Sequence, residues 1–409
     1  MTVNETPVRI GLFGLFGAGN SGNDGSLEAV LDRLRAARPD AVVDAMCGGP
    51  EIVATRYGIP ATRLNWYRGE YRTASGLSSV AAKALGKLVD VVRTAAWVRR
   101  HDAVIVPGTG VLETTLPLRP WGFPYSLFLL CATGRLFGTR VALVSVGAGP
   151  IGNRPTRILT RWSTRLAAYR SYRDTQSREA MRAMGVNTAR DEVYGDLVFA
   201  LPAPAANEPA GTPGPVCVGV MDFHGSNDER DRAEEIHRRY LDGTTGFVRA
   251  LVEEGRPVRL LTGDELDRPV AAAIVDAVGS PLVTVAEAAS LADLMKETAC
   301  ADSVVATRYH NIVCALKVGT PTLALSYSAK SDALMAEMGM GDYCHPAREA
   351  DADRLLEQFL ELERDSARLR RTLSEQNLTV ARRVEQQFTD LAAALFPATG
   401  PTHAPRETP

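Results

Sequence analysis

The stretch VRIGLFGLFGAGNSGNDGS, residues 8–26, decides the fold class of this 409-residue chain. Residues 8–13 are mostly apolar, residues 14–25 are rich in glycine, and apolar side chains then recur at positions 27, 30, 31 and 34. This recurrence at i, i+3, i+4 and i+7 is the stripe that a helix buries against a sheet. The order of strand, glycine-rich loop and helix is typical of the first unit of a parallel α/β sheet.

The same alternation of strands and helices continues along the chain. The next strands are expected at residues 41–46, 103–106 and 141–146, and the last two end in the glycine-rich turns 107–110 and 147–150. Later strands are expected at residues 216–221, 258–262, 282–285, 303–306 and 322–325. Open parallel sheets bind ligands at the carboxyl ends of their strands, so the glycine-rich turns are expected to line one cleft.

The pattern predicts an α/β protein of two domains with the active site in the cleft between them. We expect an N-terminal Rossmann-like domain over residues 1–205, a proline-rich linker over 206–215 and a C-terminal Rossmann-like domain over 216–350. Residues 351–396 are predicted to be helical throughout. Residues 397–409 have no apolar periodicity and are predicted to be disordered.

Composition excludes several classes of protein. The 46 basic and 48 acidic residues give a formal charge of −2, which offers no global field to attract nucleic acid, so no such partner is expected. The six cysteines and six histidines lack the spacing of zinc ligands, so we expect reduced thiols and no bound metal. The first residues show no signal-peptide pattern, and the longest apolar run, 123–133, is about half of what spans a bilayer. These features predict a cytoplasmic protein.

The glycine-rich loop is the first candidate for binding. Its helix N-terminus offers free N–H groups that favour an anion, and glycines let the backbone approach a ligand closely. A tight turn capped by Asp24 or Ser26 is the alternative interpretation. The residues expected to line the cleft, from this loop and from the other two glycine-rich turns, are Gly17, Asn20, Gly22, Asn23, Gly110 and Gly149.

The sharpest candidate is Thr307-Arg308-Tyr309-His310, directly after the strand expected at 303–306. It places a permanent cation beside a titratable group at a helix N-terminus. Lys330 follows the next strand and is expected to join the same pocket. A histidine satisfied within the core is the alternative interpretation.

Three further features are open to two interpretations. Arg173 lies just before a predicted helix and can bind a carboxylate or phosphate, or pair with Asp174 at the surface. His224 follows the first strand of the second series, where it can meet a second substrate or be an ordinary loop histidine. Several arginines that surround Trp162 form either a face for acidic lipid phosphates or a solvated surface, namely Arg154, Arg157, Arg161, Arg165 and Arg170.

Taken in order, these motifs resemble the polysaccharide pyruvyl transferase family. The resemblance covers nearly the whole chain and rests above all on Thr-Arg-Tyr-His followed by Gly-Thr-Pro and Tyr-x-x-Lys. The other elements are the glycine loop of residues 14–23, Gly-Ala-Gly-Pro at 147–150, Arg-Asp-x-x-Ser at 173–177 and Tyr-Gly-Asp at 194–196.

The resemblance implies a GT-B-like arrangement of two Rossmann-like domains. It implies transfer of pyruvate from phosphoenolpyruvate to a sugar or glycan precursor, as a cyclic ketal and with release of phosphate. His310 then resembles the catalytic residue, and the donor is bound by Arg173, Arg308, Tyr309 and Lys330. Phosphoenolpyruvate is a co-substrate, and no other cofactor is implied. The N-terminal domain faces the acceptor, a nucleotide-linked or lipid-linked precursor of cell-envelope polysaccharide, which suggests peripheral contact with the inner face of the membrane.

Two other functions remain open from the residues alone. A GT-B glycosyltransferase that uses a sugar nucleotide also needs cations near a diphosphate. A noncatalytic protein that binds a sugar phosphate or lipid phosphate has less need of a histidine that titrates beside them.

Overall fold

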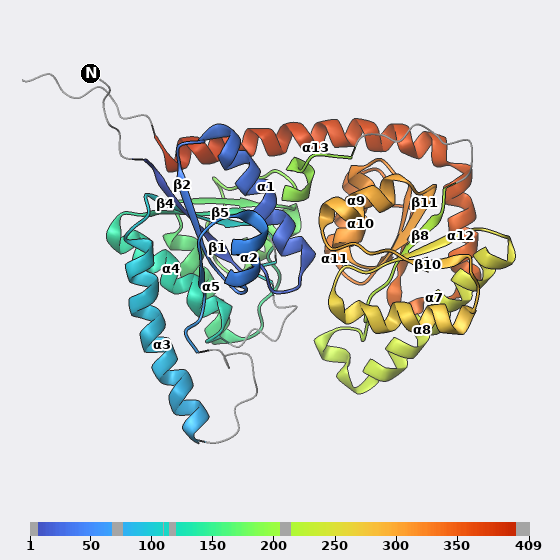
Figure 1. The fold of residues 1–409 in the computed structure, drawn as a ribbon, viewed down its shortest axis with the longest axis horizontal. Helices are drawn as coiled ribbons and strands as arrows, with labels where there is room; N and C mark the ends of the chain where they lie inside the picture. Colours follow the sequence, from blue (N-terminus) through green and yellow to red (C-terminus); the bar gives the residue numbers. More distant parts are fainter. Residues whose placement is uncertain (1–6, 68–76, 109, 114–119, 205–213, 398–409) are drawn as a thin grey trace, which may run out of the picture.

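Two parallel β-sheets follow one another along the chain (Figure 1). The computed structural model describes residues 7–67, 77–108, 110–113, 120–204 and 214–397. The first sheet has the order β3-β2-β1-β4-β5-β6-β7, and the second has the order β10-β9-β8-β11-β12-β13. In each sheet the strand order reverses beside the first strand, between β1 and β4 and between β8 and β11. Such reversal points are where open α/β sheets bind ligands.

Each strand expected from the sequence is present, with ends that differ by up to two residues. The first sheet contains β1 Arg9–Gly14, β2 Val42–Cys47, β3 Ala61–Arg63, β4 Ala103–Pro107, β5 Arg140–Val146, β6 Tyr169–Tyr172 and β7 Glu192–Val193. The second contains β8 Val216–Gly219, β9 Val258–Leu261, β10 Val283–Val285, β11 Ser303–Ala306, β12 Thr322–Ser326 and β13 Cys344–Pro346. The prediction missed β3, β6, β7 and β13, which are two to four residues long.

Helices connect the strands and cover both sheets. The first half has α1 Ser21–Ala37, α2 Pro50–Tyr57, α3 Leu77–Val98, α4 Phe123–Phe137, α5 Arg154–Leu166, α6 Thr175–Ala183 and the 3₁₀ turn η1 Leu197–Ala200. The second half has η2 Asn227–Arg232, α7 Ala233–Glu253, η3 Glu265–Asp267, α8 Arg268–Val278, α9 Leu291–Ala299, α10 Tyr309–Lys317, α11 Ala329–Glu337 and η4 Ala347–Glu349. Two C-terminal helices follow, α12 Ala352–Arg364 and α13 Ser366–Leu395.

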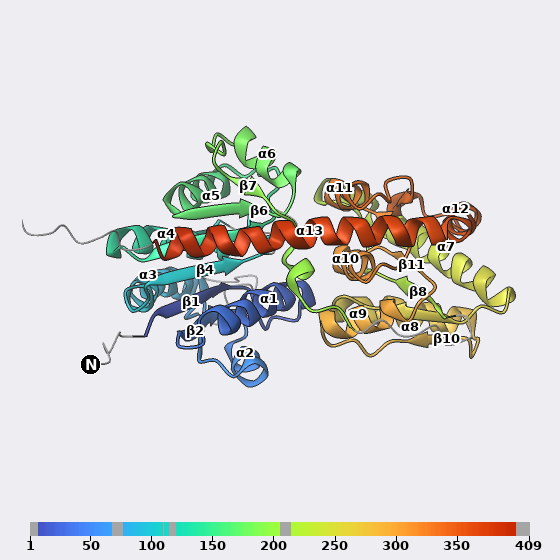
Figure 2. The ribbon, with the colours of Figure 1, turned by 90° about the horizontal axis from the view of Figure 1, so that it is seen from above.

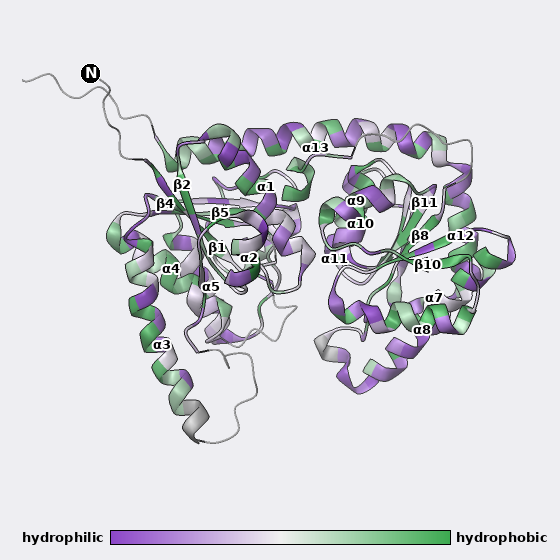
Figure 3. Cartoon of the chain, in the orientation of Figure 1, coloured by the Kyte–Doolittle hydropathy of each residue, from purple (hydrophilic) through white to green (hydrophobic). Residues whose placement is uncertain are grey.

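Alternation along β1 sends its side chains into two cores. Ile10 and Leu12 lie in the core cluster that also contains Leu27 of α1, whereas Phe13 lies in the cluster that contains Phe123 of α4. Successive side chains of a strand point to opposite faces, so this sheet is buried on both sides. In Figure 3 most strands have the colour of hydrophobic residues, whereas hydrophilic and hydrophobic residues alternate along the helices.

The C-terminal helices join the two halves. The predicted helical segment is interrupted at Asp365, where α12 ends and α13 begins. Helix α13 then runs back across both halves of the molecule (Figure 2), where it contacts β5 and β6 of the first sheet and α10 of the second half. Buried Gln387 of α13 donates to the hydroxyls of Ser145 and Ser171 at 2.8 and 2.7 Å, which anchors the helix to the first sheet.

Two predicted segments fall largely outside the described residues. They are the linker, of which only residues 214–215 are described, and the tail after residue 397. Within the described ranges, no helix has both the length and the hydropathy that a membrane span requires.

Candidate functional site

The glycine-rich loop is a tight turn with a strong helix cap. The Asn20 side chain accepts hydrogen bonds from the N–H groups of Gly22 and Asn23, each at 3.1 Å. The N–H of Gly17 donates to buried Asp24 at 2.8 Å, and a positive φ of 67° suits Gly17 to this position. These hydrogen bonds are those of a tight turn that leads into a capped helix. The cap is Asn20, and not Asp24 or Ser26 as the sequence suggested.

Gly22 also forms part of the junction between the two halves. A methyl group placed on Gly22 would lie 1.9 Å from Cε1 of His310, so the imidazole rests against the Gly22 backbone. The Ser21 hydroxyl, one residue earlier, donates to the Gly263 carbonyl at 3.0 Å. The start of α1 thus faces the start of α10, as the prediction of a shared cleft requires.

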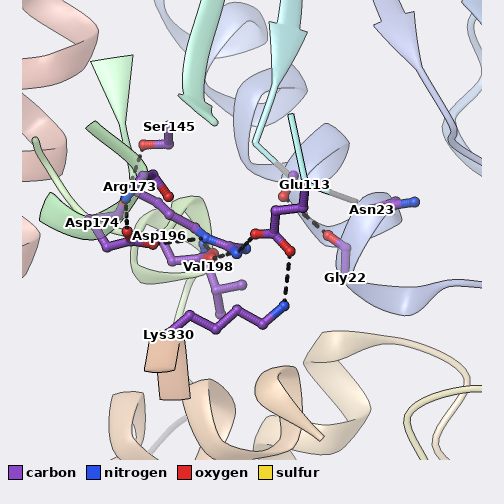
Figure 4. Close-up of polar contacts among 12 residues, drawn as sticks. Gly22, Asn23, Glu113, Ser145, Arg173, Asp174, Asp196, Val198 and Lys330 are labelled. Carbon is purple, nitrogen blue, oxygen red and sulfur yellow. Dashed lines mark hydrogen bonds and ion pairs between the residues drawn. The ribbon is translucent and has the colours of Figure 1, made fainter. Parts of the chain in front are cut away.

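Arg173, Glu113 and Lys330 form a charged cluster across this junction (Figure 4). Glu113 pairs with the Arg173 guanidinium through one oxygen, and its other oxygen lies 3.1 Å from Nζ of Lys330. Arg173 follows β6, whereas Lys330 belongs to α11 in the other half. Burial acts to raise the pKa of Glu113, but the two cations outweigh it and hold that pKa below its ordinary value.

The Tyr309 ring packs between the two cations of this cluster. The ring centroid lies 4.7 Å from the guanidinium carbon of Arg173 and 5.5 Å from Nζ of Lys330. An aromatic face attracts a cation at these distances. Burial raises the pKa of Tyr309, so the phenol stays neutral. This residue helps to position the cations.

His310 lies half-buried beside the cluster. Burial lowers its pKa to about 4, and Arg173 and Lys330 act in the same direction against the opposing effect of Asp196. Among the described residues, no hydrogen bond to the imidazole is found. The ring is therefore neutral at pH 7 in the unliganded protein and is free to exchange a proton with a ligand.

The other two glycine-rich turns surround Glu113. A methyl group on Gly110 would lie 2.8 Å from the Glu113 carboxyl carbon, and one on Gly147 would lie 2.4 Å from a Glu113 oxygen. Gly149 is farther away, at 3.9 Å from the Glu113 Cα by the same construction. These glycines permit close approach of a buried carboxylate.

Arg308 points to a different partner from the one expected. It forms two hydrogen bonds with fully buried Asp267, through Nε at 2.8 Å and through an NH₂ nitrogen at 2.5 Å. Burial acts to lower the pKa of Arg308, but Asp267 raises it further, so the guanidinium stays charged. Much of its binding capacity is thus already used within the protein.

His224 belongs to a separate group at the end of β8. Its Nε2 lies 2.9 Å from Asp222, and its ring stacks on His237 with centroids 4.3 Å apart. No described contact links His224 to Glu113, Arg173 or Lys330.

Two of the arginines in the predicted face around Trp162 bond to other groups of the protein. Arg170 lies in β6, not on the helix, and pairs with Asp191 at 2.8 Å. Arg165 donates to the Gly185 carbonyl at 3.0 Å. Trp162 is half exposed beside it.

Sequence reasoning missed the central carboxylate, Glu113. The available signal was an acidic residue three positions after the glycine-rich turn that follows β4, because ligands of open parallel sheets bind beyond the carboxyl ends of the strands. The three predicted cations are therefore not free, and the carboxylates beside them are Glu113, Asp174, Asp196 and Asp267.

Comparison with solved structures shows the fold alone. The chain is similar to the S. aureus MnaA–UDP co-structure, with a TM-score of 0.62 and 12% identity over 95% of this chain and 97% of the other. It is similar to UDP-GlcNAc 2-epimerase from Neisseria meningitidis bound to UDP-GlcNAc, with a TM-score of 0.59 and 11% identity over 93% and 99% of the two chains. It is also similar to a glycosyltransferase from Rickettsia africae, with a TM-score of 0.58 and 8% identity over 96% of this chain and 100% of the other. The chain thus has two Rossmann-like sheets in a GT-B-like arrangement, as predicted.

Comparison at the level of sequence identifies the family. No curated protein matches the chain significantly. The family model for polysaccharide pyruvyl transferase matches residues 20–329, which include the end of the glycine loop, Glu113, Arg173 and His310, and stop one residue before Lys330. Because this match extends over most of the chain, the protein belongs to the polysaccharide pyruvyl transferase family.

Proposed function

We propose that this protein transfers pyruvate from phosphoenolpyruvate to a sugar or glycan precursor and releases phosphate. The observation that carries the proposal is the junction where Arg173, Lys330 and His310 meet. Glu113 already bridges the two cations, which supports a pocket that accommodates a carboxylate. The donor has a carboxylate and a phosphate, and guanidinium and ammonium groups bind both.

In the proposed reaction, a proton adds to the methylene carbon of the donor and a sugar hydroxyl attacks C2. The bond from C2 to the phosphate oxygen then breaks, and phosphate leaves with the electron pair. A second hydroxyl attacks the same carbon and closes the ketal. Of the two protons that the hydroxyls release, one replaces the proton added to the methylene carbon and the other leaves with the phosphate. Arg173 and Lys330 stabilise the negative charge on the donor and on the departing phosphate.

His310 is the proposed acid, and its low pKa sets a condition on that role. At pH 7 the imidazole is neutral before a ligand enters. A bound donor adds about three negative charges, and nearby negative charge raises the pKa of a histidine. Donor binding therefore precedes protonation of His310 in this proposal, so binding takes up a proton.

The Arg308 guanidinium has a second part in the proposal. Its Nε and one NH₂ nitrogen face Asp267, which leaves the other N–H groups of the fork for the donor. We place the acceptor on the N-terminal half, at Gly17, Asn20, Gly22 and Asn23. A cytoplasmic reaction on a nucleotide-linked or lipid-linked precursor fits this arrangement, and the half-exposed Trp162 on α5 supports contact with a membrane surface.

The experiment measures melting temperature with phosphoenolpyruvate for the wild type, Lys330→Met and Lys296→Met. Lys296 is the matched control because it lies on the surface of the same half, 3.6 Å from Asp293. We expect stabilisation of the wild type and of Lys296→Met, and its loss in Lys330→Met. Equal stabilisation of all three would contradict the assignment of the donor site.

A sugar-nucleotide glycosyltransferase is the second candidate. It is favoured by the likeness to the MnaA–UDP co-structure and to an epimerase bound to UDP-GlcNAc. The same melting experiment with sugar nucleotides distinguishes the two. Stabilisation by sugar nucleotides and none by phosphoenolpyruvate would favour the glycosyltransferase.

A further inference from the structure

Three side chains of metal-ligand type meet at the end of β8. Asp222 and His224 lie in the loop after that strand, and His237 lies on α7. One potential ligand atom from each falls within 4.8 Å of the others. The residues are separated by one position and then by twelve, so the sequence pattern does not resemble a zinc motif and none was expected.

One of the two distances to Asp222 already matches the spacing of ligands around a single metal ion, and the other is a hydrogen bond that a bound ion would replace. Nε2 of His224 and Nδ1 of His237 lie 2.9 and 3.6 Å from the same oxygen of Asp222. Ligands at about 2.0–2.2 Å from a tetrahedral ion are roughly 3.3–3.6 Å apart. The imidazoles stack at 4.3 Å with an angle of 9° and must turn to face one ion. Both are partly exposed, which leaves room for that rotation.

The backbone that carries Asp222 is held from two sides. Its N–H donates to Asp267 at 3.0 Å, and the N–H of Met221 donates to the hydroxyl of Tyr240 at 3.1 Å. Tyr240 is buried on α7, one turn after His237. The loop and the helix that supply the ligands are thus fixed relative to each other, as a preorganised site requires.

We propose that Asp222, His224 and His237 bind one divalent transition-metal ion of the zinc class. Two imidazoles and one carboxylate are a common set of ligands for such ions and leave a coordination position for water or another oxygen ligand. The Asp267 carboxylate accepts hydrogen bonds from the Asp222 N–H and from Arg308, so it links the metal site to Arg308. The proposal concerns binding and does not depend on the proposed pyruvyl transfer.

The test is Zn²⁺ binding to the full-length protein after chelator treatment, by competition with a chromophoric chelator. We expect one equivalent of Zn²⁺ for the wild type. We expect at least tenfold weaker binding for His224→Ala, His237→Ala and Asp222→Asn. Glu253→Gln is the control for α7, because Glu253 is exposed near the other end of that helix and should leave binding unchanged. Far-ultraviolet circular dichroism checks that each variant is folded.

A second control removes a competing thiol. Cys300 is exposed, and thiolates bind Zn²⁺ strongly, so Cys300→Ser is measured in parallel. Unchanged binding in Cys300→Ser, with loss in the two histidine variants, supports the site. Binding that survives both histidine substitutions, or that is lost only in Cys300→Ser, would overturn the proposal, as would the absence of binding by the wild type.

Discussion

Replacement of Glu113 by Gln should strengthen donor binding and lower the free energy of unfolding of the unliganded protein. In the wild type, the Glu113 carboxylate occupies the same cations that the proposed donor needs, Arg173 and Lys330. The donor must therefore compete with an internal anion. A neutral amide at position 113 keeps the shape of the side chain and removes the competing charge.

The expected change in donor affinity is estimated from the ion pair between Glu113 and Lys330, which is 3.1 Å long and joins two side chains that are mostly buried. A hydrogen bond to a charged group contributes about 1.5–3 kcal/mol. If the donor no longer has to break it, the dissociation constant for phosphoenolpyruvate falls by roughly 10- to 150-fold, since about 1.4 kcal/mol is a factor of ten. Stability of the unliganded variant falls by about 1–3 kcal/mol, because Arg173 keeps only Asp174 and Asp196, at 3.3 and 3.9 Å.

The assay combines a melting curve without ligand and a calorimetric titration with phosphoenolpyruvate. Glu235→Gln is the control, because Glu235 is an exposed acid that pairs with Arg232 at 3.2 Å on the surface of the second half. It should change neither quantity. Weaker donor binding by Glu113→Gln than by the wild type would refute the reasoning, since Glu113 would then hold the cations in place for the donor.

Three further predictions concern the junction and its surroundings. Gly22→Ala should reduce turnover at least 100-fold, because the new methyl group would lie 1.9 Å from the His310 ring; activity within twofold of the wild type would contradict that contact. The pKa of His310, lowered to about 4 by burial, means that the unfolded chain takes up a proton at pH below 6.5 before the folded chain does. The free energy of unfolding should therefore fall from pH 6.5 to 4. In denaturant titrations, this fall should be smaller in His310→Asn than in the wild type, by at most about 3 kcal/mol; parallel pH profiles of the two proteins would refute the prediction. Burial also lowers the pKa of Lys317 to about 8, so the free energy of unfolding should rise between pH 8 and 10.5. Lys317→Met also loses the hydrogen bond to the Phe199 carbonyl, but it should show a smaller rise over this range. A rise of equal slope in the variant would count against the prediction.

The architecture was largely predictable because it depends on local patterns. The apolar run at β1, the glycine-rich loop and the apolar stripe of α1 are adjacent in the sequence, and each follows the period of its element. The short strands β6 and β7 lack such runs: β6 has the sequence YRSY and β7 has only two residues. Their pairing depends on neighbours that are distant in the sequence.

The site was predictable only where charge and strand ends coincide. Arg173, His310 and Lys330 each lie at the end of a strand or the start of a helix, and the structure brings them together. Glu113 is 60 residues from Arg173 and 217 from Lys330, so no spacing in the sequence connects them. The orientation of Arg308 toward Asp267, 41 residues earlier, depends on tertiary packing in the same way.

The ion pairs of Glu113 with Arg173 and Lys330 influence which anions can bind at the junction between the halves. Glu113 comes from the first half and Lys330 from the second, so their bond is a direct link between the halves. An anion that replaces Glu113 must satisfy Arg173 as well as Lys330, because a buried cation without a partner is costly. Inorganic phosphate has one anionic group and can satisfy both cations only from a single point between them. The proposed donor carries two anionic groups, a carboxylate and a phosphate, attached to the same carbon. It can reach each cation with a different group, which favours phosphoenolpyruvate over its own product, phosphate. In the proposed reaction, departure of phosphate would let Glu113 pair with Lys330 again, and this pairing would favour loss of the product.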